Sequence, residues 1–402
     1  ADADRRTGLD RRQAAILMDG MARPVTAAYL YPWDVAGDPD AAQRLAALGL
    51  AEVTLAAVYH ATRAVTPRHP RHRIVTAERT AAYVPLNDSR WRGAPIALSK
   101  ADDSFIEAAE TLRARGLDVH AWVVFNHVDR PGDDHRFGVV NAYGDRYPWA
   151  LCPSYDEVVS YATTVVDEIT ELDGLAGIEL EACGWYGVDH MCAHDKATLP
   201  DSAHGRHLLS LCFCSACVAS FTAAGLDADR LRRDVRAALD GPLHGTETDD
   251  TSGVNVLGEQ APTVAGVRRA LAERFRDTVI ERIRARRPEW RVALHASPNP
   301  ATTTAFTGLD MDARDRAGHR TSPDTLVVNC WTDHDSVAAS LSAGIPVHAN
   351  VLAVAGLGGD PYTLIGRGQA ALRAGATGVR LYHAGLASDR DRSAMSSFIA
   401  AL

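Results

Sequence analysis

The sequence predicts a single (β/α)8 barrel. Three observations predict this fold. Short apolar runs alternate with amphipathic helical stretches along most of the chain, there are eight such runs, and each ends in polar or aromatic residues. Strands that alternate with helices form a parallel sheet, and eight such units close into a barrel. At 402 residues and 46% hydrophobic content, we expect one domain over residues 1–402 with a large core.

The expected strands are short runs rich in Val, Ala, Leu and Ile, and their ranges are 25–31, 52–60, 119–127, 177–181, 291–295, 326–331, 347–351 and 379–383. Helical stretches follow most of them, and Gly or Pro precedes several of the strands. The expected helices are 40–48, 104–115, 155–172, 264–286, 336–343, 363–374 and 389–402.

Two long insertions interrupt this alternation, at about 62–99 after the second strand and about 185–229 after the fourth. Both follow carboxyl ends of strands, where barrel enzymes build their sites. The first contains a basic patch, Pro67–Arg73, which could hold a carboxylate or phosphate of a substrate. The alternative is a solvated loop whose arginines pair with neighbouring acids.

Polar and aromatic side chains gather where the strands end. Aromatic faces suit the C–H surfaces of sugars, and His, Asn and carboxylates hold hydroxyls. We therefore expect a carbohydrate site there. Its expected residues are Trp33, Tyr59, His60, Asn126, His127, His295, Asn329, Trp331, His348, Asn350 and Tyr382.

The strongest acid candidates are Glu179 and Glu181, at the end of the fourth strand. Strand residues two apart face the same way, so both glutamates are expected to face the barrel axis. Two close carboxylates repel, which raises the pKa of one of them toward that of a general acid. The alternative is that one glutamate pairs with a barrel arginine such as Arg380.

Three cysteines in C-x-C-x-x-C spacing, Cys212, Cys214 and Cys217, can turn their thiolates toward one metal ion. A tetrahedral zinc site needs a fourth ligand, for which Cys152 is the candidate, and His190, Cys192 or His194 could replace a ligand. Four thiolates leave no open position, so such a zinc would be structural. The alternative is a group of free buried thiols.

The order Cys-Pro before a helix, a strand ending in acids, and then C-[aromatic]-C-x-x-C before a helix resembles family 42 glycoside hydrolases over 147–226. The resemblance implies a β-galactosidase-like barrel with structural zinc on Cys152, Cys212, Cys214 and Cys217. With a one-residue shift it also implies that Glu181 is the acid/base. The family nucleophile is a glutamate at strand seven, but the sequence has no Glu after Glu289. The partner carboxylate is therefore expected to be Glu179 or an aspartate such as Asp333.

Composition limits the remaining classes. A net charge of −9 argues against a nucleic-acid or anionic-membrane partner, and no apolar run reaches the length of a membrane span. Seven cysteines, four of them in a metal site, favour a reducing, cytoplasmic location. Homo-oligomer formation is left open. Three functions remain. The first is a glycosidase, for which an acidic or unusual sugar is one candidate substrate. The others are a barrel that binds carbohydrate without catalysis, and a metal-dependent lyase or isomerase using His127, Glu179, His295 and His348.

Overall fold

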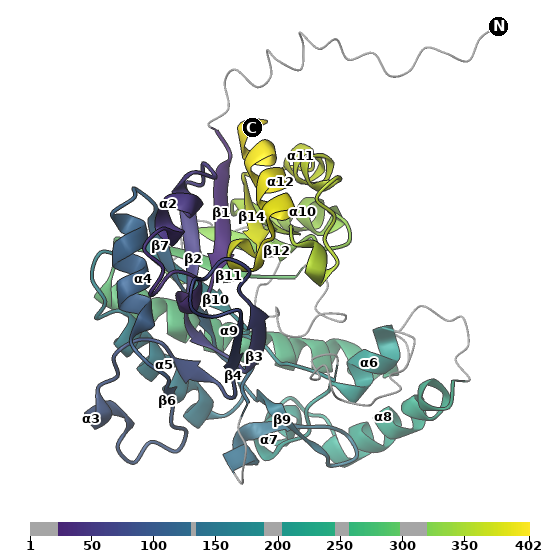
Figure 1. Ribbon diagram of the computed structural model, residues 1–402. Coiled ribbons are helices and arrows are strands. Elements are labelled where there is room, and N and C mark those ends of the chain that lie inside the picture. The colour runs from purple at the N-terminus through teal and green to yellow at the C-terminus, as the bar shows by residue number, and fades with distance from the viewer. Residues whose placement is uncertain (1–22, 130–133, 189–202, 246–256, 298–319) are drawn as a thin grey trace, which may run out of the picture.

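The computed structural model describes residues 23–129, 134–188, 203–245, 257–297 and 320–402. Eight parallel strands form a closed ring in which β1 pairs with both β2 and β14 (Figure 1). The predicted (β/α)8 barrel is confirmed. In ring order the strands are β1 Val25–Leu30, β2 Glu52–Tyr59, β7 Asp118–Val124, β10 Gly177–Glu181, β11 Arg291–His295, β12 Thr325–Asn329, β13 Val347–Leu352 and β14 Gly378–Tyr382.

Alternation along each strand decides what fills the barrel. In β10 the apolar Ile178 and Leu180 are fully buried, while Glu179 reaches Arg380 of β14 across the interior and Glu181 accepts from Trp122 of the neighbouring strand β7. Close pairing also restricts residue size. A Cβ at Gly177 would lie 2.1 Å from the Arg291 carbonyl oxygen of the neighbouring strand, so only glycine fits there.

Helices cover the outside of the ring. In Figure 1, α10, α11 and α12 lie together beside β14, and α4 lies on the other side of the barrel near β7. Each helix falls within or close to a predicted stretch, and α9 begins three residues earlier than expected. They are α2 Ala41–Ala46, α4 Ser104–Arg113, α5 Asp156–Ile169, α9 Ala261–Arg286, α10 Asp335–Ser340, α11 Leu364–Arg373 and α12 Asp389–Ala400.

The last helix ties the end of the chain to the first strand. A capping box formed by Ser388 and Asp391 starts α12, and Arg23 donates a hydrogen bond to the Ile399 carbonyl, 3.4 Å away.

The turn that follows α11 contains Gly375, whose φ of +111° favours glycine. A Cβ at this position would also lie 2.6 Å from the Leu341 side chain.

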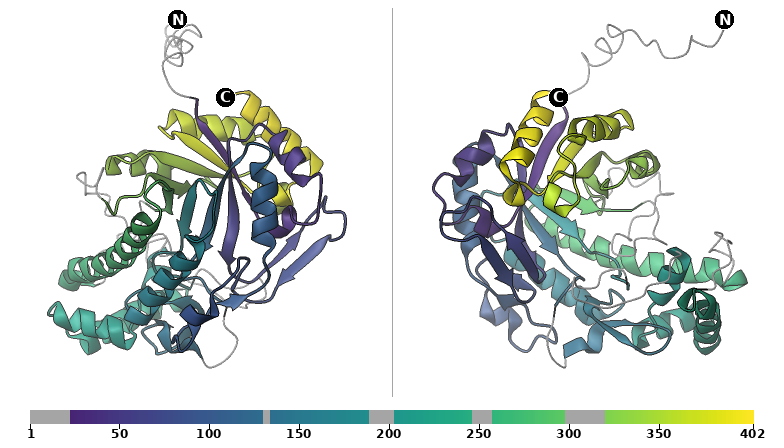
Figure 2. Two further views of the ribbon diagram at one scale, coloured as in Figure 1. Left: turned by 90° about the vertical axis from the view of Figure 1, so that its left-hand side faces the viewer. Right: turned by 45° about the vertical axis from the view of Figure 1, so that its right-hand side comes forward.

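Additional elements follow three of the strands. After β2 come the hairpin β3 Thr62–Val65 and β4 Ile74–Ala77, then β5 Ala81–Ala82, α3 Asp88–Trp91 and β6 Ser99–Lys100. After β10 come α6 Ala203–Leu209, α7 Ser215–Ala223 and α8 Ala228–Leu243. Figures 1 and 2 show this helical group toward the end of the barrel to which β1 runs, away from α11 and α12.

A second hairpin, β8 Gly138–Val140 with β9 Arg146–Leu151, follows β7. The apolar pattern alone does not predict it, because its strands are short and its turn carries the signal. The turn contains Asn141, which accepts backbone hydrogen bonds from Tyr143 and Asp145, and Gly144 at a φ of +98°. Within the described residues, no helix is long and apolar enough to cross a membrane.

Candidate active site

A cavity of about 310 Å³ lies at the carboxyl ends of the barrel strands. All eight barrel strands, or the residues just after them, contribute to its wall. Those predicted from sequence are Tyr59, His60, His127, Glu181, His295, Asn329, Trp331, Asn350 and Tyr382. The others are Tyr31, Thr62, Trp122, Tyr186, Ala296 and Val327.

Trp122 is the most important wall residue absent from the predicted set. It lies on β7 in register with Glu179 of the neighbouring strand β10, so its side chain faces the barrel interior as that of Glu179 does. Its ring centroid is 4.7 Å from that of Tyr59 and 4.8 Å from that of Tyr29. The alternation that predicted the direction of Glu179 and Glu181 would have found Trp122 as well.

Glu181 is the carboxylate on the cavity wall. Its side chain is 13% exposed, and the indole Nε1 of Trp122 donates a hydrogen bond to Oε2 over 2.8 Å. The hydroxyl of Tyr186 lies 3.5 Å from the other oxygen, and His295 Nε2 lies 3.9 Å from Oε2. Trp122 and Tyr186 therefore donate to Glu181, which has no direct arginine partner among the described residues.

Glu179 lies deeper, is fully buried, and is not part of the cavity wall. Arg380 Nη1 is 2.9 Å from one carboxylate oxygen, which also accepts a hydrogen bond from Thr54 over 3.0 Å. The other oxygen accepts from Tyr29 over 2.5 Å and is 2.7 Å from His295 Nε2. The pairing with Arg380, left open from the sequence, is present.

The electrostatics of Glu179 follow from this environment. Burial by itself raises the pKa of its carboxyl, but Arg380 and the His295 contact outweigh burial and hold that pKa well below its usual range. Glu179 is therefore a fixed anion at neutral pH.

His295 connects the two glutamates. Burial lowers the pKa of its imidazole, whereas Glu181 and Glu179 raise it, and the net direction is upward. Burial also raises the pKa of Tyr29 and Tyr59, so these phenols stay neutral. The barrel interior thus holds one fixed anion with its arginine below the cavity, and a second carboxylate on the cavity wall.

Several predicted ligand residues lie elsewhere. Trp33 stacks on Tyr31 at 4.6 Å, behind the cavity wall. Asn126 is fully buried and donates to the Gly184 carbonyl over 3.1 Å. His348 is the second residue of β13, too early in the strand to reach the carboxyl end, and packs against Gly378.

Asp333 follows β12 and is exposed. Its carboxylate accepts a hydrogen bond from the backbone N–H of Asp335, the first residue of α10, over 3.0 Å. Its side chain is not part of the cavity wall, although Trp331, two residues earlier, is.

Aromatic rings form much of the wall. Tyr31 and Tyr59 meet edge to face at 5.1 Å, Trp331 and Tyr382 lie 5.1 Å apart, and His127 stacks on Tyr186 at 4.4 Å. Flat apolar faces with interspersed Asn, His and carboxylate groups can bind a polyhydroxylated ring, whose faces are apolar and whose edges are polar.

The four cysteines Cys152, Cys212, Cys214 and Cys217 come together outside this cavity and are buried. The sulfur of Cys152 lies 3.5 Å from that of Cys217, 3.6 Å from that of Cys214 and 3.7 Å from that of Cys212. Four sulfurs at about 2.3 Å from a tetrahedral zinc would be about 3.8 Å apart. The spacing therefore fits a metal ion, and the other candidates, His190, Cys192 and His194, lie outside the described residues.

Hydrogen-bond donors surround the cluster. Trp185 Nε1 and the backbone N–H of Val140 donate to the sulfurs of Cys152 and Cys212 over 3.3 and 3.4 Å. The buried Arg268 guanidinium lies 4.3 Å from the Trp185 ring centroid. Hydrogen bonds from the neighbouring thiols lower the pKa of Cys214 far below its ordinary value. Burial raises the pKa of Cys212, and hydrogen bonds with the other cysteines raise that of Cys217, so without a metal ion the negative charge gathers on Cys214. This donor set can hold a soft or borderline cation with no open position.

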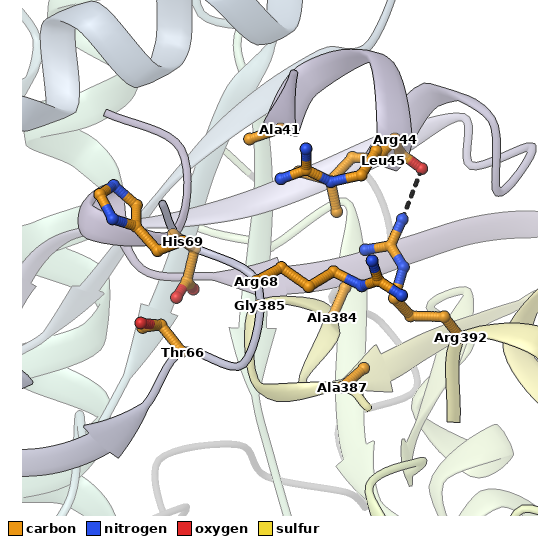
Figure 3. A pocket seen from close by; sticks show the side chains of 11 residues that line it. Ala41, Arg44, Leu45, Thr66, Arg68, His69, Ala384, Gly385, Ala387 and Arg392 are labelled. Carbon is orange, nitrogen blue, oxygen red and sulfur yellow. Dashed lines mark hydrogen bonds between the residues drawn. The ribbon is translucent and has the colours of Figure 1, made fainter. Parts of the chain in front are cut away.

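The basic patch of the first insertion faces another part of the surface. Figure 3 shows Arg68 and His69 in a small pocket with Arg44 and Arg392, between the first insertion, α2 and the chain around α12. Arg68 pairs with Asp389 and Arg44 with Asp38, while Arg392 donates to the Arg44 carbonyl over 2.7 Å. Arg68 thus pairs with a neighbouring acid, as the alternative from sequence describes, and no residue of Pro67–Arg73 contributes to the strand-end cavity.

No family model matches the sequence, and no curated protein matches it. Several solved structures do match it. The glycoside hydrolase domain of PgaB (BpsB) from Bordetella bronchiseptica matches with a TM-score of 0.58 at 15% identity, covering 94% of this chain and 99% of that one. The catalytic domain of β-amylase from Paenibacillus polymyxa matches with 0.54 at 11%, covering 94% and 99%.

A β-galactosidase from Marinomonas ef1 matches with a TM-score of 0.52 at 10% identity, covering 93% of this chain and 59% of the galactosidase. At these identities the likeness shows the fold. The chain shares a barrel architecture with glycoside hydrolases.

Proposed function

We propose that this protein is a barrel enzyme that cleaves a glycosidic bond, with Glu181 as the proton donor to the leaving oxygen. The observation that carries the proposal is the position of Glu181. Its carboxylate is on the wall of an aromatic-lined cavity at the carboxyl ends of the strands, where barrel enzymes place their chemistry. Likeness in fold to glycoside hydrolases supports the same class.

In this proposal the two glutamates of β10 have different roles. Glu181 reaches a ligand and gives or takes a proton. Glu179, held by Arg380 and Tyr29, stays ionised and orients His295, whose imidazole lies between the two carboxylates. Glu179 is then a positioning residue, and the attacking partner is another group.

Asp333 remains the predicted partner carboxylate, because it follows β12, two residues after the cavity residue Trp331. To act, its carboxylate would have to leave the backbone N–H of Asp335 and turn toward the cavity. There it would either activate a water molecule or attack the sugar carbon itself. Asp333→Asn tests this role. Full activity in that variant would remove Asp333 from the mechanism and leave the proposal for Glu181 intact.

We further propose that the four-cysteine cluster binds structural zinc, as in the family 42 enzymes that this region resembles. The sulfur spacing near that of a tetrahedral thiolate site supports this. A zinc there would hold the segment before α7 against the loop that precedes α5. The chain's own groups, Trp185, Val140 and Arg268, would stabilise the thiolates.

One observation favours a second candidate, a barrel that binds carbohydrate without cleaving it. Within the described residues, Glu181 is the one carboxylate on the cavity wall, and hydrolysis usually needs two. A binding protein would use the same aromatic faces and amides with Glu181 as a hydrogen-bond acceptor.

A substrate screen separates the two candidates. We would test aryl glycosides and aryl uronides with the wild type, Glu181→Gln and the surface control Glu110→Gln on α4, from about pH 4 to about pH 9. Turnover by the wild type and the control, lost in Glu181→Gln, supports the hydrolase. Sugar binding by all three proteins without turnover on any substrate supports the binding barrel.

A further inference from the structure

A second group of metal-ligating side chains lies at the rim of the cavity, distinct from the cysteines. His60 follows β2, and His127 and Asp129 follow β7. One ring nitrogen of each histidine and one carboxylate oxygen of Asp129 lie within 4.8 Å of one another, and all three residues are half-buried. His60 and His127 line the cavity itself, and their rings are 4.1 Å apart.

The main chain of one residue, Ala61, holds two members of this group. His60 Nδ1 is 2.8 Å from the Ala61 carbonyl oxygen, and Nδ1 must carry its proton to donate there. The lone pair of His60 is then on Nε2. The Ala61 N–H donates to Asp129 Oδ2 over 2.6 Å, and the Asp129 N–H donates to Thr80 over 2.6 Å. Such support fixes the orientation of metal-ligating side chains in proteins.

Two imidazoles and one carboxylate form a donor set for borderline divalent cations, and three protein ligands leave positions open. Metal–ligand bonds of about 2.0–2.2 Å place tetrahedral ligand atoms about 3.4 Å apart. The ligand atoms of this group lie within 4.8 Å of one another, so the most distant pair must move closer by at most roughly 1.4 Å. Side-chain rotation can supply this, because His60, His127 and Asp129 are only half-buried.

We propose that His60, His127 and Asp129 bind a first-row divalent cation such as Zn²⁺ at the cavity rim, with open positions that take oxygen atoms of a carbohydrate ligand. The cation site does not depend on the proposed glycosidase function. The assignment of carbohydrate oxygens as its ligands does rest on that proposed function. Because Glu181 and the two histidines line the same cavity, a ligand oxygen on the cation would place the rest of the sugar along the aromatic wall. The chemistry favours ligands with adjacent oxygens, such as vicinal hydroxyls or a uronate carboxylate.

Cobalt substitution tests the cation site directly. Co²⁺ alone would be titrated into the full chain after dialysis against a weak chelator that leaves thiolate-bound metal in place, and bound cobalt per chain would be measured together with the absorption spectrum. A thiolate site gives intense sulfur-to-cobalt charge-transfer bands, and a histidine-carboxylate site does not. We expect a cobalt ion without thiolate bands, in addition to any thiolate-bound ion, in the wild type.

Variants identify the ligands. Asp129→Asn keeps an oxygen that can accept the Ala61 hydrogen bond but removes the charge, and His60→Gln removes the imidazole. Both should lose the ion that lacks thiolate bands and keep any thiolate-bound ion. His72→Gln is the matched control, because His72 stacks on His69 at 4.4 Å outside the cavity. It should bind as the wild type does.

The proposal is overturned if the wild type binds cobalt only at a thiolate site. It is also overturned if the wild type, Asp129→Asn and His60→Gln bind the same amount of cobalt that lacks thiolate bands. In either case the two histidines serve as stacking faces only. The readout is metal content, so a failure here is distinct from absence of glycosidase activity. Stronger binding of a uronate than of its neutral sugar, in the metal-loaded protein only, would support the ligand assignment, and equal binding with and without metal would refute it.

Discussion

Glu179→Gln should destabilise the barrel although Glu179 is not on the cavity wall. The substitution keeps the shape of the side chain but removes the negative charge that Arg380 contacts at 2.9 Å. Arg380 is 2% exposed, and its other described charged neighbour, Glu52, is 3.8 Å away. The variant therefore leaves a buried guanidinium without its closest anion.

The magnitude follows from this geometry. Breaking a buried ion pair by removing one partner costs about 3–5 kcal/mol of unfolding free energy. For a chain of 402 residues, an unfolding entropy of about 2.1 cal/mol/K per residue gives about 0.8 kcal/mol/K. The expected fall in the melting temperature is thus about 4–6 °C.

Urea unfolding and thermal circular dichroism would measure this change, with Glu181→Gln as the matched control. Glu181 is on the same strand, but its carboxylate accepts from Trp122 and has no direct arginine partner among the described residues. The control should lie within about 1 kcal/mol of the wild type. If Glu179→Gln is as stable as the wild type, or if the control loses as much, the account of Glu179 as the fixed anion of the barrel is wrong.

Three further predictions concern chemistry, metal and pH. Glu181→Gln should lower turnover by about 10²–10⁴-fold, because the amide cannot donate a proton, and sugar binding measured by calorimetry should persist. Cys214→Ser should release zinc, seen by elemental analysis, and lower the unfolding free energy, whereas zinc content unchanged from the wild type would contradict the cluster as the site. Stability should fall as acid protonates Glu179, whose pKa is below its unfolded value, and should also fall as alkali passes the raised pKa of His295. His295→Gln should reduce the loss of stability at alkaline pH, measured as the urea midpoint at several pH values. A dependence on pH unchanged from the wild type would contradict the upward pKa shift of His295.

Much of the fold follows from local sequence. The eight apolar runs and the glycines before them predict the barrel strands to within about three residues, because side-chain alternation and crossover helices are local signals. The hairpin after β7 is less visible, since its strands are short and its turn at Asn141 and Gly144 carries the signal.

The site could be predicted only in part. Spacing along the chain places Glu179 and Glu181 on one face and three of the four cysteines beside each other. It does not show that Arg380, far away in sequence, neutralises Glu179 and leaves Glu181 on the cavity wall. Depth within a strand is likewise a tertiary property. His348 has the residue type of a strand-end ligand, yet it lies near the start of β13 and does not line the cavity.

The most direct test of the central claim is a comparison of leaving groups. On the sugar that the screen identifies, the wild type and Glu181→Gln would be assayed with a dinitrophenyl glycoside, whose leaving oxygen needs no proton, and with the phenyl glycoside, whose leaving oxygen does. If Glu181 is the proton donor, the variant should lose about 10²-fold or more on the phenyl substrate and keep most of its rate of bond cleavage on the dinitrophenyl substrate. Equal losses on both substrates, or no loss on either, would contradict the assignment of Glu181.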